Sequence, residues 1–153
     1  MVTKRKRILF FVESLAGGGA EKVLSVLAPR LNKNKFDVTV FSIVNTGVYA
    51  ETVKDKVTYR YFLENPSRNL SFTARLEYWI KYHLMHLLPA AWIHRWMFRE
   101  KFDVEVAFIE GLATKIIGAS NNHKGGKMAW VHSDLAAHHW TRSIFKAVWR
   151  ERE

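Results

Sequence analysis

The fold is decided by the stretch RILFFVESLAGGGAEKVL, residues 7–24. An apolar run of strand length, residues 8–12, leads to three successive glycines, Gly17, Gly18 and Gly19, and a helical pattern follows them. The spacing predicts one helix face made of Val23, Leu24, Val26 and Leu27, with Leu31 a turn further on. A buried strand, a glycine turn and a helix in this order bring backbone N–H groups to a ligand at the helix N-terminus. The stretch therefore predicts a ligand site at residues 14–19.

The three glycines fit neither of the two common phosphate-binding motifs. A Walker A loop needs a hydroxyl residue after its lysine, but Val23 follows Lys22. A dinucleotide fingerprint begins at Gly17 and Gly19, but Lys22 stands where its third glycine should be. Glycine accepts a positive φ and has no Cβ, so the turn favours close approach of a phosphate or sugar. A tight turn without any ligand stays open as the alternative.

Composition indicates one globular domain with an anionic partner. The 153 residues are 48% hydrophobic and 25% charged, which suits a single domain with its own core. There is no cysteine, so disulfides and thiolate metal sites are excluded. The net charge of +10 indicates nucleic acid, anionic lipid or a phosphorylated substrate, or else only a solvated basic surface. No apolar run approaches the roughly 20 residues that cross a bilayer, so we expect a soluble or peripheral protein.

Strand and helix patterns alternate along the chain. Strands are predicted at residues 8–13, 36–44, 57–62, 102–109 and 127–132. Helices are predicted at 20–32, 72–101 with a break at Pro89, 112–120 and 135–152, and the connector 45–56 has room for a short one. Most of the strands are almost continuously apolar, which is typical of strands covered on both faces. The expected fold is α/β: a Rossmann-like parallel sheet with helices on both faces, in one domain spanning residues 1–153.

Four segments are expected to meet at one edge of this sheet. In parallel sheets the ligand crevice lies beyond the carboxyl ends of the strands. That rule brings together residues 14–19, 45–48, Glu110–Gly111 and 132–134. Glu110 and His132 each follow an apolar strand, so both are candidate site residues. The alternative for each is a loop residue that only hydrogen-bonds the backbone.

Four sequence segments together carry a resemblance to a known family. They are GGGAEKVL at 17–24, FDVTV at 36–40, FDVEVA at 102–107 and MAWVHSD at 128–134. In this combination the chain resembles the N-terminal half of a retaining GT-B glycosyltransferase of family 4. The resemblance implies two Rossmann-like domains facing a cleft, the first binding the acceptor and the second a nucleotide-sugar co-substrate, with no metal or other cofactor. It also implies site residues: Gly17, Gly18, Gly19, Lys22, Glu110 and Gly111 toward donor phosphate and acceptor, and His132 with Asp134 as catalytic residues near the donor sugar.

The sequence departs from this family pattern at its C-terminal end. The family's nucleotide-sugar domain would lie beyond residue 153, so we expect a truncated N-terminal domain without its donor-binding C-terminal domain. Such a chain is expected to be inactive by itself. A split gene is one explanation.

The segment 75–101 indicates the kind of acceptor. A helical apolar stripe is expected to pack on the sheet: Leu76, Trp79, Ile80, His83, Leu84, Leu87 and Leu88. The aromatic and cationic residues beyond that stripe include Trp92, Arg95, Trp96 and Arg99. Because Trp prefers the membrane interface and Arg is attracted to anionic headgroups, we expect a peripheral membrane patch that delivers a lipid-linked or cell-envelope glycan acceptor. The expected location is cytoplasmic, on the inner face of the plasma membrane.

Three other interpretations of the segment and of the basic charge are open. A helix pair that only packs on the sheet is the simplest. A non-catalytic module for nucleic acid or other anionic ligands would also use basic and aromatic residues, but no Lys/Arg run beyond residues 4–7 follows a strand surface, so nucleic acid is not favoured. A regulatory sugar- or phosphate-binding protein is the third.

Metal and serine-hydrolase chemistry are not expected. His138 and His139 are adjacent and point apart on a helix, and no carboxylate accompanies the pair His83 and His86. The consecutive residues 132–134 do not form a catalytic triad.

Overall fold

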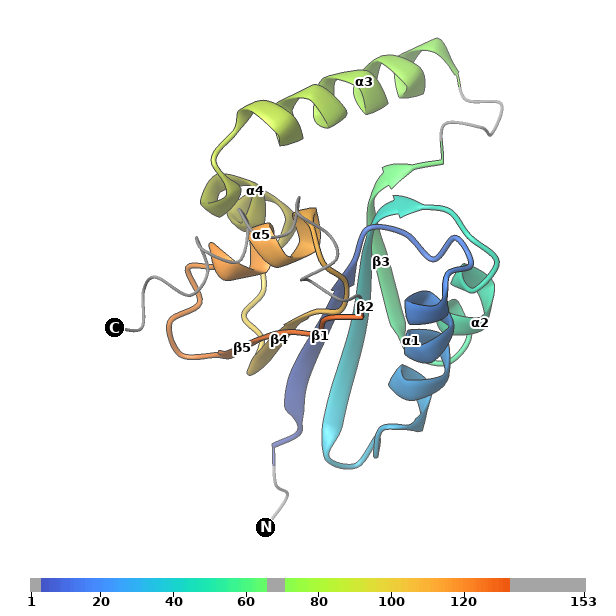
Figure 1. Ribbon diagram of the computed structural model, residues 1–153, viewed down its shortest axis with the longest axis vertical. Helices are drawn as coiled ribbons and strands as arrows, with labels where there is room; N and C mark the ends of the chain where they lie inside the picture. The colour runs from blue at the N-terminus through green and yellow to red at the C-terminus, as the bar shows by residue number, and fades with distance from the viewer. Residues whose placement is uncertain (1–3, 66–70, 133–153) are drawn as a thin grey trace.

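The computed structural model describes residues 4–65 and 71–132 (Figure 1). Its five strands form one parallel sheet in the order β3-β2-β1-β4-β5. Their bounds are β1 Lys6–Val12, β2 Phe36–Asn45, β3 Thr58–Glu64, β4 Val104–Ala107 and β5 Gly126–Ala129. In register, Ile8 of β1 lies between Val38 of β2 and Val104 of β4. The predicted α/β class with a Rossmann-like parallel sheet is confirmed.

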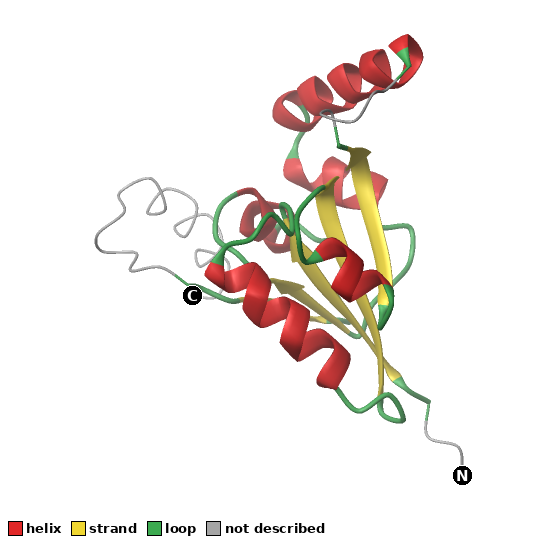
Figure 2. Ribbon diagram, turned by 90° about the vertical axis from the view of Figure 1, so that its right-hand side faces the viewer, coloured by secondary structure: helices red, strands yellow, loops and turns green. Residues whose placement is uncertain are grey.

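Helices cover both faces of the sheet (Figure 2). α1 (Gly19–Arg30) and α2 (Ala50–Lys54) cover one face, and α4 (Ala90–Met97) and α5 (Leu112–Gly118) cover the other. The remaining helix, α3 (Phe72–Leu87), reaches the second face through Met85. The predicted break at Pro89 and the short helix in the connector 45–56 are both present. The predicted helix 135–152 lies outside the described residues.

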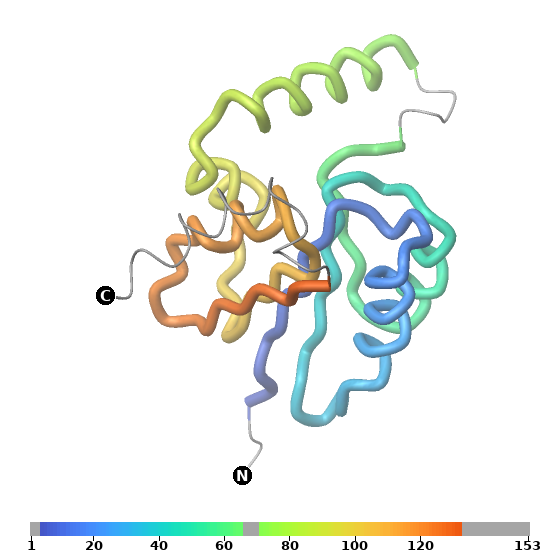
Figure 3. The backbone as a smooth tube through the Cα atoms, viewed as in Figure 1, coloured from blue at the N-terminus to red at the C-terminus, as the bar shows by residue number. Residues whose placement is uncertain are grey.

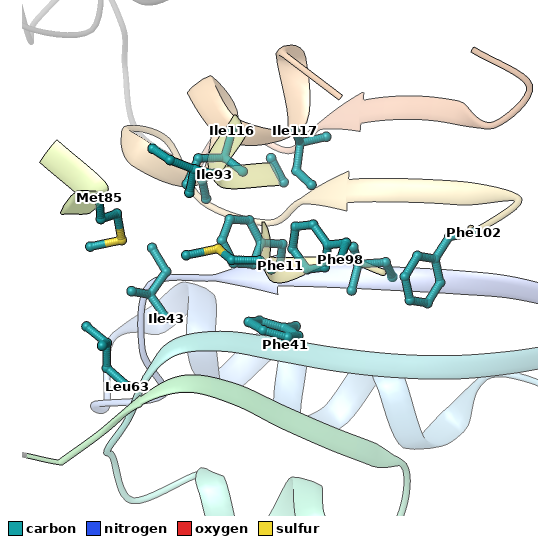
Figure 4. Packing of buried hydrophobic residues seen from close by; sticks show 14 residues of the cluster. Phe11, Phe41, Ile43, Leu63, Met85, Ile93, Phe98, Phe102, Ile116 and Ile117 are labelled. Carbon is teal, nitrogen blue, oxygen red and sulfur yellow. The ribbon is translucent and has the colours of Figure 1, made fainter. Parts of the chain in front are cut away.

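Alternate side chains of β1 build the two halves of the core. Leu9 and Phe11 face α4 and α5, whereas Phe10 and Val12 face α1 and α2, as expected for a strand whose side chains alternate. Around Phe11, edge-on ring contacts join Phe41 at 5.9 Å and Phe98 at 5.2 Å (Figure 4). Both faces of β1 are therefore buried from solvent, which explains its uninterrupted apolar sequence.

Helix α1 buries a narrower face than the sequence predicted. Leu24 and Ala28 are buried, and Leu27 and Leu31 pack partly against the same cluster. These four residues follow the 3.6-residue period. Val23 and Val26 were predicted on the buried face but are exposed, because they lie on the flank of the helix.

Strands β4 and β5 are shorter than predicted. β4 begins only at Val104, and the preceding Asp103 accepts a 2.8 Å hydrogen bond from the backbone N–H of Arg7 through its carboxylate. β5 was expected to run from 127 to 132 as a buried strand. It ends at Ala129, and all four of its residues are exposed, since it is the last described strand at one side of the sheet (Figure 3).

Helix α3 presents to the core the face that the sequence analysis left outside. Its inward contacts come from Tyr78, Met85 and, just beyond its end, Leu88. Most of the predicted packing stripe points away, since Leu76, Trp79, Ile80 and Leu87 are exposed by 47%, 56%, 43% and 79%, and only Leu88 at its end packs on the core as predicted. Both faces are apolar, so periodicity alone could not decide between them. The helix lies beyond the carboxyl ends of β2 and β3, as both ribbon views show (Figures 1 and 2).

Candidate functional site

The glycine loop after β1 leads directly into α1. Gly17 has φ +128°, a conformation that favours glycine. Gly18 is the N-cap with φ −72°, and no side chain caps it. A Cβ on Gly19 would meet nothing within 4 Å. Of the three glycines in this loop, only Gly17 is therefore required by a positive φ. The lack of a side chain at Gly19 leaves open space at the helix N-terminus.

The side chain of Glu21 lies over this helix N-terminus. A Cβ built on Gly18 would come within 2.3 Å of the Glu21 Oε2 atom. An acidic side chain here is favoured by the positive end of the helix dipole. Lys22, predicted to contact phosphate, has an exposed side chain, and its backbone N–H bonds the Gly18 carbonyl at 3.1 Å. The Glu21 carboxylate therefore occupies the position that an anionic ligand would take at the N-terminus of α1. The sequence analysis did not predict this.

A second loop, after β2, is joined to the glycine loop by backbone hydrogen bonds. Leu15 N–H donates to Thr46 O at 3.0 Å, and Tyr49 N–H donates to Leu15 O at 3.3 Å. Gly47 lies between them with φ +117°, and a Cβ there would be 1.7 Å from Leu15 O. Gly47 is thus the glycine most tightly required at this edge. In the sequence, the only indication of this requirement is that Gly47 stands two residues after an apolar strand.

Glu110 connects the ends of β4 and β5. Its side chain is buried, and its Oε1 accepts a 2.9 Å hydrogen bond from the backbone N–H of His132. Gly111 follows with φ +97° and is the N-cap of α5. Nearby, Glu13 Oε1 accepts from Leu112 N–H at 3.1 Å, which ties the end of β1 to the start of α5. The structure thus brings the predicted residues Glu110, Gly111 and His132 together.

The imidazole of His132 packs on aromatic rings and is exposed. Its centroid lies 5.0 Å from the Phe108 ring and 5.9 Å from the Trp130 ring, to which it is nearly parallel. His132 follows β5 by three residues instead of ending it, a correction to the predicted strand. The predicted partner Asp134 lies outside the described residues.

Polar side chains also gather at the ends of β2 and β3. Ser42 and Tyr59 share a hydroxyl hydrogen bond of 2.7 Å, and Asn45 donates to Glu64 Oε1 at 2.8 Å. Burial raises the pKa of Tyr59, a shift that the Ser42 hydrogen bond opposes. A hydrogen bond to Glu64 raises the pKa of Tyr61. The sequence analysis placed residues 45–48, and therefore Asn45, at this edge of the sheet, but it did not name Ser42 and Tyr59, which lie inside predicted strands, or Glu64, which follows one.

The four residues predicted to face a membrane divide into two groups. Trp92 is 67% exposed, and Arg95 and Arg99 are exposed. Trp96 is half-buried, with its ring edge-on to Phe62 at 4.7 Å between centroids. Trp96 is therefore partly a packing residue. Among the helices described, none is long and apolar enough to cross a bilayer.

No group of three His, Asp or Glu side chains within residues 4–65 and 71–132 could hold a metal ion.

Comparisons with known proteins found solved structures of low similarity to this chain. No protein-family model matches the chain, and no curated protein sequence matches it. The C-terminal domain of a hydrogenase from Pyrococcus furiosus superimposes with TM-score 0.49 at 13% identity, covering 84% of this chain and 94% of that domain. A mutant O-GlcNAc transferase from Thermobaculum terrenum gives TM-score 0.48 at 12% identity, covering 83% of this chain. The match spans only 21% of that transferase, and at these values neither protein indicates what this chain does.

Proposed function

We propose that this chain forms the acceptor side of a retaining glycosyltransferase, which transfers a sugar from a nucleotide-sugar to a lipid-linked or cell-envelope glycan acceptor. The observation that carries the proposal is the hydrogen bond from His132 N–H to Glu110 at the carboxyl-terminal edge of the sheet. The Glu13–Leu112 bond ties this edge to the strand that carries the glycine loop. Together with the family resemblance of the same segments, this supports a shared site.

The residues at this edge suit the chemistry of sugar transfer. A retaining transfer passes through an oxocarbenium-like state while negative charge builds on the departing diphosphate. The open N-terminus of α1 at Gly18 and Gly19 offers backbone N–H groups for that charge, provided Glu21 moves aside. The exposed ring of His132 offers one hydrogen-bond donor and one acceptor when neutral.

The position of α3 supports a membrane-bound acceptor. The helix lies beyond the carboxyl ends of β2 and β3, and the glycine loop follows the carboxyl end of β1, so both lie at the same edge of the sheet (Figure 1). Its outward face carries exposed Trp79 and Leu87, and Trp92 of α4 is exposed as well. We infer peripheral attachment at the inner face of the plasma membrane through these helices, since apolar burial and anionic headgroups both favour it.

An acceptor-binding experiment tests the proposal with the chain itself. Octyl glucoside, kept below its micelle concentration, serves as acceptor mimic in a titration of ¹⁵N-labelled protein. We expect amide shifts at Gly17, Gly111 and His132, and none in the Gly47→Ala variant, whose loop is displaced. A single-stranded oligonucleotide is the competing ligand. Shifts caused by the oligonucleotide and not by the glucoside would replace this proposal with a nucleic-acid-binding module.

A further inference from the structure

A basic hollow lies at the edge of the sheet opposite the glycine loop, and the proposed sugar transfer does not use it. Its volume is about 360 Å³. Its walls come from the C-terminal end of α1, the first residues of β2 and the connection from α2 to β3, with Arg5 just before β1. Because these segments lie at the amino-terminal ends of the strands, the length of the sheet separates the hollow from the glycine loop (Figure 1).

Four basic side chains line this hollow, and they come from three separate parts of the sequence: Arg5, Lys33, Lys54 and Lys56. Arg5 Nη1 donates to the Lys33 carbonyl at 3.4 Å, which joins the N-terminal segment to the loop between α1 and β2. Lys54 pairs with Glu51 at 2.9 Å. In the part of the chain that the structure describes, Arg5, Lys33 and Lys56 have no ion-pair partner. Three cations at the hollow are therefore unpaired.

Two carboxylates in the lining reduce this positive charge only in part. Asp37 Oδ2 lies 4.0 Å from Arg7 Nε, so a cation outside the lining already balances its charge. Asp55 is exposed and forms no ion pair with any described residue. Three unpaired cations against one unpaired carboxylate leave a net charge of +2 in the hollow.

The segments that meet at this edge carry much of the protein's positive charge. Residues 4–6, 30–35 and 54–56 contain eight basic residues and one acidic residue. The basic residues are Lys4, Arg5, Lys6, Arg30, Lys33, Lys35, Lys54 and Lys56. They are a third of the 24 Lys and Arg residues, so this edge accounts for much of the net charge of +10. The sequence analysis did not find this surface, because its three segments are far apart in the chain.

The shape and chemistry of the hollow favour a small phosphorylated ligand. A volume of this size suits a single small molecule. Its floor is apolar, since Leu31, Phe36 and Val57 pack against the core cluster beneath it. Among the lining residues Phe36 is the only aromatic one, so the hollow lacks the exposed rings on which single-stranded nucleic acids stack. Lys and Arg bind phosphate, and linked phosphoryl groups can contact several of these cations at once.

We propose that this hollow binds a small ligand with two or more linked phosphoryl groups, held by Arg5, Lys33 and Lys56. The site is independent of the proposed sugar transfer, whose residues lie at the other edge of the sheet. One bound ligand joins the N-terminal segment, the α1–β2 loop and the α2–β3 connection. Because the ligand binds only the folded arrangement of these segments, it also raises the melting temperature.

A titration with three anions tests the site. Inorganic triphosphate, orthophosphate and a single-stranded oligonucleotide are added separately to ¹⁵N-labelled protein. We expect triphosphate to shift the amide signals of Lys33, Lys56 and Thr58 and to bind at least about tenfold more tightly than orthophosphate, because it contacts more cations. Shifts confined to Gly18 and Gly19 would place triphosphate at the N-terminus of α1 and overturn the proposal.

The other two anions provide further ways to overturn it. Equal affinity for triphosphate and orthophosphate would mean that linked phosphoryl groups are not recognised. If the oligonucleotide shifts the same amides and displaces triphosphate, the edge is a nucleic-acid surface instead.

Matched variants separate the hollow from general charge attraction. Lys33→Gln with Lys56→Gln removes two unpaired cations, so triphosphate affinity should fall roughly twenty-five-fold, about fivefold for each exposed charge. Lys115→Gln with Lys124→Gln lowers the net charge equally at two exposed lysines outside the lining, and affinity should stay within about twofold. An equal loss of affinity in the two pairs would show that net charge alone attracts triphosphate.

Two further variants keep the result interpretable if a lysine variant is less stable. Lys33→Arg with Lys56→Arg retains both charges and should bind triphosphate as the wild type does. Asp55→Asn removes the unpaired carboxylate, so it should tighten binding about threefold. Triphosphate should raise the melting temperature of the wild type and of the Arg pair, but not that of the Gln pair. An equal rise in all of them would overturn the proposal.

Discussion

His94 on α4 and Glu105 on β4 form a buried polar pair, with His94 Nε2 3.0 Å from Glu105 Oε2 and exposures of only 7% and 1%. Asn122 donates to the other carboxylate oxygen of Glu105 at 3.0 Å. Burial raises the pKa of Glu105, but hydrogen bonds from His94, Ser120 and Asn122 outweigh it and hold the pKa below its ordinary value of 4.5. The pair fixes α4 on the sheet.

Replacing this carboxylate should give a pH-dependent loss of stability. Glu105→Gln removes charge-assisted hydrogen bonds, so we expect a loss of about 2 kcal/mol in the free energy of unfolding at pH 7. Because the folded pKa lies below the unfolded one, the stabilisation is complete above pH 4.5 and is lost as the pH falls further. Urea unfolding between pH 7 and pH 3 measures it. A difference between wild type and variant that stays constant over this range would contradict the assignment, and exposed Asp55→Asn is the control.

The second prediction concerns the loop contact at Gly47. In Gly47→Ala the Cβ would overlap Leu15 O at a φ of +117°, so the loops after β1 and β2 must separate. We expect a loss of about 3 kcal/mol or more in urea unfolding. Gly19→Ala is the matched control, since its Cβ meets open space, and it should be neutral or stabilising by about 0.5 kcal/mol. Equal stability of both variants would show that the loop contact is unimportant.

Much of the fold was predictable because its signals are local. The strands β1 and β2 are apolar on both faces, Pro89 breaks a helical pattern, and Gly17 marks the turn into α1. The candidate site was predictable to the extent that it follows strand ends, as Glu110 and His132 do.

The features that sequence reasoning missed depend on tertiary contacts. Gly47 is constrained by a carbonyl of another loop, and Glu21 folds back over Gly18. The orientation of α3 could not be read from periodicity, because Tyr78 and Met85 on one face rival Leu76 and Ile80 on the other. Trp96 was assigned to a membrane surface because its packing partner Phe62 lies far away in sequence.

The third prediction concerns the carboxylate over the helix N-terminus. Glu21→Gln removes a negative charge from the place where a diphosphate would approach Gly18, so pyrophosphate should bind about fivefold more tightly. Amide shifts of Gly18 and Gly19 in an NMR titration measure this affinity. Glu51→Gln, in the first turn of α2, is the control and should have no effect. Lack of any pyrophosphate response in both wild type and variant would remove this loop from the donor site.

The fourth prediction concerns membrane attachment. A triple variant, Trp92→Ser with Arg95→Gln and Arg99→Gln, should detach the protein from vesicles of equal parts phosphatidylglycerol and phosphatidylcholine. Trp96 is left in place because it packs on Phe62. Each arginine contributes about 1 kcal/mol near an anionic surface, so loss of the two arginines alone should lower the vesicle-binding constant roughly thirtyfold. Co-sedimentation with the vesicles measures this constant. Wild-type binding should fall with added salt, since screening acts over about 8 Å at physiological ionic strength.

The control for attachment removes equal charge elsewhere. Lys33→Gln with Lys124→Gln changes two exposed lysines outside α3 and α4. If this pair reduces vesicle binding as much as the triple variant does, net charge alone explains the attraction and the helices have no special part.

The last prediction concerns the ring of His132. Its backbone N–H holds Glu110, so His132→Ala keeps that hydrogen bond and removes only the imidazole. If the chain acts in a glycosyltransferase as proposed, we expect His132→Ala to lower the turnover of that enzyme roughly a hundredfold, the scale of losing one well-placed polar group. His132→Phe separates two roles of the ring, since it keeps the stacking on Phe108 and Trp130 but lacks the nitrogens. If His132→Phe is as slow as His132→Ala, a ring nitrogen contacts the reacting sugars. Near-normal turnover of His132→Phe would make His132 a packing residue, and Glu110 would then be the next side chain to test.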